Sequence, residues 1–294
     1  MPSLKSLKNR IKGVKSNQKV TKAMKMVAAS KLRHAKDAQD ASKPYSSRML
    51  FLIKHILSAL ENEVDTPQLL RGRDRDDIVL LLVLTSDRGL CGAFNGSIIR
   101  KSLAYANELM AEGKEVRFFC VGKKAVETIN KHHSNKVVFT ATGVVGKKLS
   151  YVKIKDLVDK LVELFEEGQF DRCMVIYNHF LSALSQQVVI EQFLPIDDHR
   201  LETENTSPTH TIYEFEPSKA AILESLIPKH LAVHLYYIFL ENIASEHGAR
   251  MTAMENATQN AGDMIGELTL VYNRTRQAAI TKELIEIISG AQAV

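Results

Sequence analysis

The sequence predicts an α/β protein: a long antiparallel coiled coil of N- and C-terminal helices with an inserted Rossmann-like α/β domain. Two observations predict this architecture. Apolar residues recur at steps of three and four at both ends of the chain, and strand-like and helical patterns alternate in its middle. About 70 helical residues at the C-terminal end would span roughly 105 Å, several times the diameter of a domain of this size. Such a helix needs a partner, which only the N-terminal stretch can supply.

The composition is that of a folded globular protein, with 45% hydrophobic and 25% charged residues among 294. The longest uninterrupted apolar run has the length of a strand, so the sequence predicts no membrane span. The N-terminus also lacks the apolar core of a signal peptide. Three scattered cysteines without metal-ligand spacing are expected to be reduced and buried: Cys91, Cys120 and Cys173.

Residues 1–60 are predicted to form the first helix of the coiled coil, with Ser3 as its N-cap. A kink or short break is expected at Pro44. The apolar stripe comprises Leu4, Leu7, Ile11, Val14, Val20, Met24, Val27, Leu32 and Ala35, followed by Met49, Leu52, Ile53, Ile56, Leu57 and Leu60.

Charge is distributed unevenly, because residues 1–36 carry eleven Lys and Arg and no acid, while the remainder of the chain is net acidic. A solvated helix face, nucleic acid, anionic lipid and an acidic protein surface are the possible explanations. Aromatic side chains that could stack on bases are absent until Tyr45, and no nucleic-acid-binding motif is present. Eleven like charges repel one another, so an opposing acidic surface is favoured.

The middle of the chain is predicted to be a linker over 61–77, an α/β domain over 78–200 and a connecting segment over 201–216. The first strand is apolar along its whole length, which indicates burial on both faces and a largely parallel sheet. Strands are expected at 78–86, 116–121, 137–141, 173–177 and 187–194, and helices at 98–110, 123–130 and 154–165.

Residues 217–294 are predicted to form the second helix of the coiled coil. Past its regular seam the pattern changes to a dense apolar cluster of Leu284, Ile285, Ile287 and Ile288, which either contacts a partner or packs on the first helix. The seam itself is His247, Met251, Met254, Thr258, Ala261, Ile265, Leu268, Tyr272, Thr275 and Ala279.

The turn after the first strand, Gly89-Leu90-Cys91-Gly92, is neither a dinucleotide-binding fingerprint nor a P-loop, so its amides are not arranged for phosphate. His132 and His133 lie in a polar context typical of solvated histidines. No catalytic set or metal-ligand spacing is evident. A free-standing α/β enzyme with a coiled-coil arm would need such a set, and the sequence therefore predicts no cofactor and no metal.

Four stretches together resemble the γ subunit family of the rotary proton-translocating ATP synthase, and the resemblance extends over the whole chain in order. The family's C-terminal signature is matched by ITKELIEIISGAQA at 280–293, and its N-terminal helix by KVTKAMKMVAASKL at 19–32. Its central-domain turn is matched by SDRGLCGAFN at 86–95, and its long helix by Ser245-Glu246, Ala249-Arg250-Met251 and Ala253-Met254.

The resemblance implies a non-catalytic shaft that threads a ring of three α and three β subunits. The α/β domain would be a foot on the membrane rotor ring of c subunits and would bind the ε subunit. The implied location is peripheral, on the cytoplasmic face of a bacterial plasma (inner) membrane, with no cofactor and no nucleic acid. The alternative is a basic coiled-coil protein that binds nucleic acid or a membrane surface.

The resemblance also implies roles for particular residues. Tyr213 and Glu216 are the implied contacts to the rotor ring. Lys25 departs from the pattern, since some relatives carry an acid or Gln at that place. Coupling contacts to the β subunit fall to Arg276 and Gln277, with Arg250, Thr281 and Glu283 in the same region between the helices and Met24 opposite them.

Overall fold

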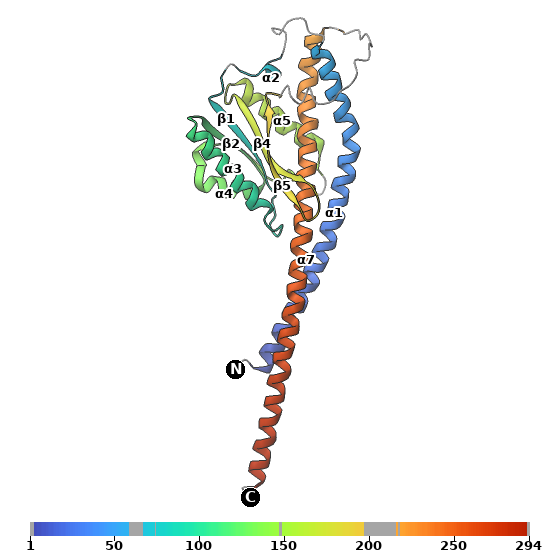
Figure 1. Ribbon diagram of the computed structural model, residues 1–294, viewed down its shortest axis with the longest axis vertical. Helices are drawn as coiled ribbons and strands as arrows, with labels where there is room; N and C mark the ends of the chain where they lie inside the picture. The colour runs from blue at the N-terminus through green and yellow to red at the C-terminus, as the bar shows by residue number, and fades with distance from the viewer. Residues whose placement is uncertain are drawn as a thin grey trace. The chain divides into compact units, whose positions relative to one another are not determined.

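The computed structural model describes residues 3–58, 67–73, 75–146, 149–196, 216 and 218–292. Two compact units make up the chain. The first, here called the helical unit, combines Met1–Ser30 with Arg250–Val294, and the second, the α/β unit, is Lys31–Ala249. Helices α1 (Leu4–Ser58) and α7 (Lys219–Gln292) each contribute a segment to both units (Figure 1).

The helical unit is an antiparallel pair of helices, as the sequence predicted. The Gln18 amide of α1 donates to the Thr258 carbonyl at 3.3 Å, and the hydroxyls of Thr21 and Thr258 lie 2.7 Å apart. Further along α1, Lys25 forms an ion pair with Glu255. The residue numbers of the partners on α7 decrease as the residue numbers on α1 increase, so the two helices are antiparallel.

The predicted seam of α7 is confirmed within the helical unit. Met254 is buried, and the positions flanking the seam are largely exposed. The half-buried seam positions are Met251, Thr258, Ala261, Ile265, Leu268, Tyr272, Thr275 and Ala279.

The α1 side of the seam differs from the prediction. Val20 and Val27 are 54% and 57% exposed, whereas Ala28 is 1% exposed and Gln18 and Thr21 are half-buried. The seam thus keeps its steps of three and four, but two of its positions are polar residues, which a search for apolar residues does not detect. These polar side chains are tolerated because their hydrogen-bonding groups pair with Thr258 across the interface.

Helix α1 continues through Pro44, where a kink or short break was expected. Pro44 is exposed, so water can satisfy the backbone carbonyl that loses its partner. The residues that follow hold the helix in place, because Met49, Ile53 and Ile56 are buried in the core of the α/β unit.

The α/β unit contains a five-stranded sheet of order β3-β2-β1-β4-β5, in which only β5 is antiparallel to its neighbour. The prediction of a largely parallel sheet is therefore confirmed. The strands are β1 (Ile78–Leu84), β2 (Glu115–Val121), β3 (Val137–Ala141), β4 (Arg172–Phe180) and β5 (Gln186–Leu194). The helices are α2 (Gln68–Arg71), α3 (Phe94–Ala111), α4 (Lys123–His133) and α5 (Tyr151–Glu166), with a 3-10 turn, η2, at Ser134–Lys136.

Two cores lie on opposite faces of this sheet, and β1 contributes alternate residues to each. Val79, Leu81 and Val83 pack with α3 and α4, while the even-numbered residues of β1 pack with α5 and with α7 from Leu223 to Phe239 (Figure 1). The three cysteines are buried, in agreement with the prediction, and none of them forms a disulfide.

In the described part of the chain, no helix is both long enough and apolar enough to span a bilayer.

Candidate functional site

The C-terminal end of α7 has the most unusual surface of the helical unit. Every position from Ile280 to Ser289 is exposed, and Ile287 is 67% exposed. The large apolar side chains here are Ile280, Leu284, Ile285, Ile287 and Ile288. The alternative of packing against the first helix is excluded within the described residues, because α7 extends beyond the start of α1 (Figure 1). Contiguous exposed apolar side chains on a helix mark a binding surface.

Most of the predicted coupling residues lie on or beside this end of α7. Arg276, Gln277, Thr281 and Glu283 occupy two successive turns and are exposed. The Thr281 hydroxyl donates to the Gln277 carbonyl at 2.9 Å, inside the helix, so it is not directed at a partner in this chain.

Met24 does not lie opposite those residues, contrary to the expectation. The ion pair of Lys25 with Glu255 places half-buried Met24 level with Glu255. That level is about 30 Å along α7 from Arg276 at 1.5 Å per residue. The antiparallel register accounts for the difference and leaves two levels of candidate residues, with Arg250 at the level nearer Met24.

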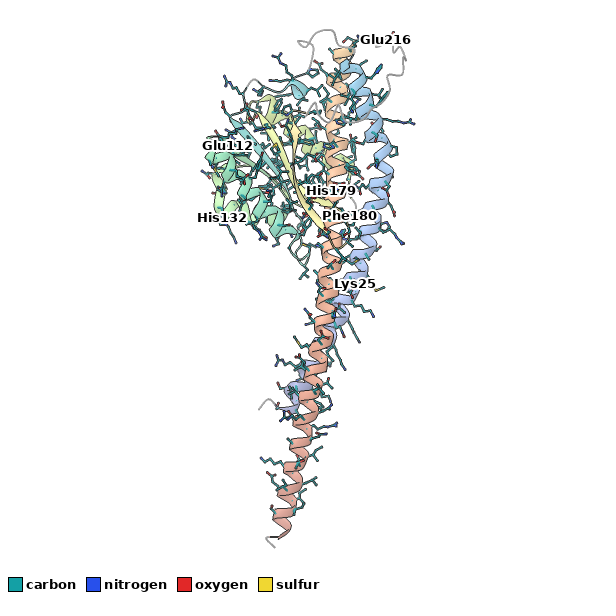
Figure 2. The ribbon with its side chains drawn as sticks, viewed as in Figure 1. Lys25, Glu112, His132, His179, Phe180 and Glu216 are labelled. Atoms are coloured by element: carbon teal, nitrogen blue, oxygen red, sulfur yellow. The ribbon has the colours of Figure 1, made fainter. Side chains whose placement is uncertain are left out.

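The predicted rotor-ring residues can be placed only in part. Glu216 is exposed and lies just before the first turn of α7 (Figure 2). Tyr213 lies outside the described residues.

Side chains of α7 fill the place where doubly wound sheets bind ligands. In such sheets the ligand crevice opens at the carboxyl ends of the strands where the strand order reverses, here between β1 and β4. The Asn242 Oδ1 accepts a hydrogen bond from the Asn178 backbone N–H at 3.0 Å, and its amide donates to the Leu84 carbonyl at 3.4 Å. The Ser245 hydroxyl donates to the Asn178 carbonyl at 2.9 Å. These groups are buried, so the helix occupies the crevice.

The amides at the N-terminus of α4 are also used within the chain. One Asp87 carboxylate oxygen accepts from the Lys123 N–H at 3.0 Å, and the Thr85 hydroxyl accepts from the Ala125 N–H at 2.9 Å. A helix N-terminus is the usual place for a phosphate in this type of fold. Here a carboxylate and a hydroxyl of the chain itself take that place.

A family model described as ATP synthase matches residues 3–294. The ATP synthase gamma chain of Sinorhizobium medicae (strain WSM419) is 46% identical over 294 residues, which is 100% of each chain. That of Brucella ovis (strain ATCC 25840 / 63/290 / NCTC 10512) is 47% identical over 295 residues, again covering both chains in full. This chain belongs to the ATP synthase gamma chain family.

Solved structures share the fold of this gamma-family chain. A chain of the Euglena gracilis mitochondrial ATP synthase (OSCP/F1/c-ring, rotational state 3) superimposes with a TM-score of 0.65 at 22% identity, covering 99% of this chain and 94% of that one. A chain of the Tetrahymena thermophila mitochondrial ATP synthase central stalk/c-ring gives 0.60 at 23% identity, covering 81% and 99%. At these identities the likeness concerns the fold, and it confirms the predicted architecture.

The basic face of this gamma-family chain is displayed on the helical unit. Among the cations of α1 in this unit, Lys25 forms an ion pair with Glu255 of α7 (Figure 2). The exposed cations of α1 in this unit are Lys5, Lys8, Arg10, Lys12, Lys15, Lys19 and Lys22. A surface with so many cations attracts acidic loops from several ångströms away at physiological salt.

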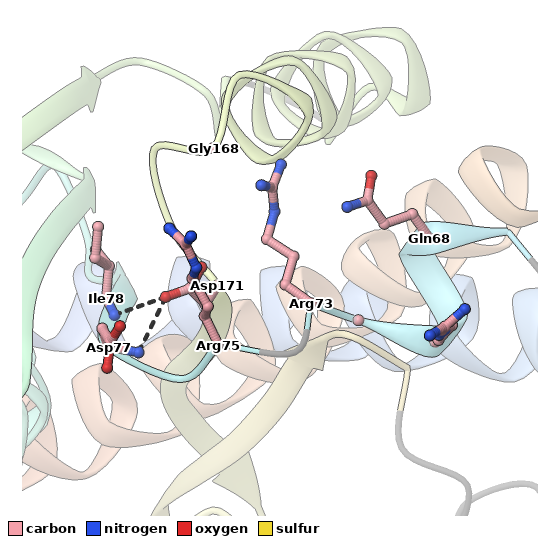
Figure 3. A pocket seen from close by; sticks show the side chains of 9 residues that line it. Gln68, Arg73, Arg75, Asp77, Ile78, Gly168 and Asp171 are labelled. Carbon is pink, nitrogen blue, oxygen red and sulfur yellow. Dashed lines mark hydrogen bonds between the residues drawn. The ribbon is translucent and has the colours of Figure 1, made fainter.

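A pocket of about 540 Å³ lies in the α/β unit of this gamma-family chain, beside the start of β1 (Figure 3). Two of its charged side chains, those of Arg73 and Asp171, have structural roles. Arg73 donates to the Phe165 and Glu166 carbonyls at 2.5 and 3.2 Å, which caps the C-terminus of α5. Buried Asp171 accepts from the backbone N–H groups of Asp77 and Ile78 at 3.0 and 2.9 Å. This pocket was not predicted from the sequence, because most of its lining residues lie in the stretch expected to be a linker, 61–77.

Proposed function

We propose that this chain is the central rotor shaft of a proton-translocating ATP synthase, coupling proton flow through a membrane rotor ring to ATP synthesis or hydrolysis at the β subunits. The observation that carries the proposal is the uncovered end of α7. Five large apolar side chains are exposed there, on the part of the helix that extends beyond α1. A rotor tip enclosed by other subunits needs such a surface, because the enclosing subunits supply the missing apolar cover.

The shaft performs no chemistry in this proposal. Its α/β unit has its ligand crevice filled by Asn242 and Ser245, and the N-terminal amides of α4 are already bonded. The role left to it is mechanical: its orientation biases which conformation each catalytic β subunit adopts.

The proposed partners follow from family membership and from the surfaces of this chain. Three α and three β subunits surround one copy of the helical unit, and acidic loops of these subunits meet the exposed lysines of α1. The α/β unit forms the foot, which binds the ε subunit and rests on the rotor ring through Glu216 and Tyr213. The complex places the chain peripherally on the cytoplasmic face of a bacterial inner membrane.

The coupling residues act at two levels of the shaft in this proposal. Arg276, Gln277, Thr281 and Glu283 contact the β subunits near the tip, where all four are exposed. Met24 and Arg250 act nearer the foot. The separation along α7 suggests that different parts of the surrounding ring touch the two groups.

Co-purification tests the assembly. A tagged full-length chain expressed with its cellular partners is expected to bring down α and β subunits at about one copy per three of each, measured by native mass spectrometry. Recovery of the chain without these subunits, or with nucleic acid that is released by raising the salt concentration, would favour the basic coiled-coil alternative instead.

A double variant tests the tip. Arg276→Ala with Gln277→Ala is expected to reduce ATP-driven proton pumping by inverted membrane vesicles, while the α/β unit keeps its fold. Arg100→Ala with Asn107→Ala is a matched control, because it removes one guanidinium and one amide from exposed positions on α3. Pumping equal to the control at equal assembly would show that the tip residues do not take part in coupling.

A further inference from the structure

Several polar side chains of α7 are buried in the α/β unit, and three of them lie close together along the helix: Glu241, Asn242 and Ser245, each at most 6% exposed. Apolar residues near them on the helix are buried: Phe239 and Ala249 pack into the two cores of the sheet, and Ala244 packs with Ala35 of α1. A helix that only had to bury its face would not need polar groups here, since an unpaired polar group in a core is costly. Their hydrogen bonds therefore point to a requirement beyond burial.

Asn242 and Ser245 bind the helix to the ends of two adjacent strands. The Asn242 amide connects β4 and β1, through Asn178 N–H at 3.0 Å and Leu84 C=O at 3.4 Å, and Ser245 bonds to the Asn178 carbonyl at 2.9 Å. The side chain of Asn178 in turn donates to the Phe94 carbonyl at the start of α3, at 3.4 Å. One residue of β4 thus ties α7 to the first turn of α3.

Glu241 adds a second connection from the neighbouring position. One of its carboxylate oxygens lies 2.7 Å from Nδ1 of His179 on β4, and the other accepts from the Gln39 amide of α1 at 3.0 Å. Glu241 therefore joins α7 to the end of β4 through His179 and to α1 through Gln39, within the α/β unit. Figure 2 shows His179 and Phe180 at this end of the strand.

The strand end is also held by close packing. A Cβ atom on Gly248 of α7 would lie 3.2 Å from the Phe180 ring and 3.4 Å from the Ala183 Cα. Lys36 of α1 places its ammonium 4.5 Å from the centre of the same ring, a cation–π contact. Helix and strand end approach as closely as a glycine allows.

We propose that Asn178, Asn242 and Ser245, together with Glu241 and His179, form the joint that transmits torque between the foot and the two shaft helices; we call this set the switch-point clamp. The inference rests on the proposed function. Apolar contacts are non-directional and permit sliding, whereas hydrogen bonds fix distance and angle and so fix the register of a helix on a strand. The crevice that binds ligands in related folds is used here to hold a helix.

Angular fluctuations of the foot in the assembled complex test this proposal. A probe is attached to the foot through Glu112→Cys or His132→Cys, both at exposed positions (Figure 2), and labelling is selective because the native thiols are buried. The angular variance of the probe is recorded while the complex pauses at limiting ATP. The angular variance grows with the total compliance of the rotor, which is the sum of the compliance of the joint and that of the remaining parts. Asn242→Ala with Ser245→Ala is therefore expected to raise the variance about twofold, the value reached when the joint becomes as soft as the rest of the rotor. The rate of ATP hydrolysis without load should not change.

The control is Asn260→Ala with Ser225→Ala, which makes the same two chemical changes at exposed positions of α7. A variance equal to the control in a complex that assembles and rotates overturns the clamp. If the double variant fails to assemble, Ser245→Ala alone decides, with a smaller expected rise and the same refuting result. A parent chain that neither assembles with α and β subunits nor rotates refutes the proposed function itself, which is a different result from a rotating complex of unchanged stiffness.

Discussion

Gly122 links the end of β2 to α4, and its replacement by alanine should be among the most damaging single-methyl changes in the α/β unit. Its φ is +92° and its ψ is 140°, a region that residues with a side chain rarely adopt. A Cβ atom there would lie 2.2 Å from the Thr85 carbonyl oxygen and 2.6 Å from its carbonyl carbon. These are backbone atoms of the turn after β1, so no side-chain rotation can relieve the overlap.

The magnitude follows from two separable contributions. Gly113 also has a positive φ, +84°, but a Cβ atom there would meet nothing within 4 Å. Gly113→Ala therefore measures backbone strain alone, about 1 kcal/mol. Gly122→Ala adds the displacement of Thr85, whose hydroxyl bonds to Val121 O at 3.1 Å and to Ala125 N–H at 2.9 Å, and should cost about 4 kcal/mol in total.

Hydrogen exchange in the full-length chain measures the difference. Amides of β1 and β2 report the free energy of opening of the sheet, and the Gly122→Ala variant should exchange there about 100-fold faster than Gly113→Ala, as a difference of about 3 kcal/mol requires. A difference below about 1 kcal/mol between the two variants would refute the reasoning, because it would mean that the Thr85 backbone moves at little cost.

Three further predictions concern single side chains. Burial raises the pKa of the Cys120 thiol from 9.0 to about 12, so iodoacetamide at pH 9 should modify it far more slowly in the folded chain than in urea; the stability that this shift contributes is present below pH 9 and is lost as the pH rises toward 12. Thr258→Val should cost about 1 kcal/mol in urea unfolding because it removes a hydroxyl that bonds across the helix pair, whereas Thr269→Val, at an exposed position, should cost less than half as much. Lys25→Gln should cost at most about 0.5 kcal/mol, and the loss should vanish in 1 M salt, because the side chains of Lys25 and Glu255 are 40% and 49% exposed.

Patterns that coincide with burial could be predicted from the sequence. The seam of α7 from Met251 to Ala279 and the doubly buried strand β1 are examples, because in both the apolar period equals the structural period. The exposed end of α7 was visible as a cluster that breaks the heptad spacing, although only the structure shows that α1 leaves it uncovered.

Polar residues in buried or half-buried positions account for most of what sequence reasoning missed. Gln18 and Thr21 belong to the α1 seam, and an apolar pattern instead selected Val20 and Val27, which are exposed. The contacts of Asn242 with two strands were also missed, since hydrogen bonds between residues far apart in sequence leave no period. A signal did exist, because polar residues that include Glu241, Asn242 and Ser245 interrupt a largely apolar stretch of α7. Such an interruption indicates either exposure to solvent or a specific hydrogen-bonding partner.

Each unit is stabilised internally by a different kind of contact, and this difference fits the proposed rotor. In the α/β unit, α7 is deeply buried and its polar groups bond to strand ends, so its register on the sheet is fixed. In the helical unit the seam of α7 is only half-buried at most of its positions, and its cross-helix bonds are few and partly exposed. A helix pair with so little buried surface gains stability from whatever encloses it. Assembly with the proposed ring should therefore protect the amides of the helical unit from exchange much more than those of the sheet, and equal protection in the free and the assembled chain would argue against an enclosed shaft.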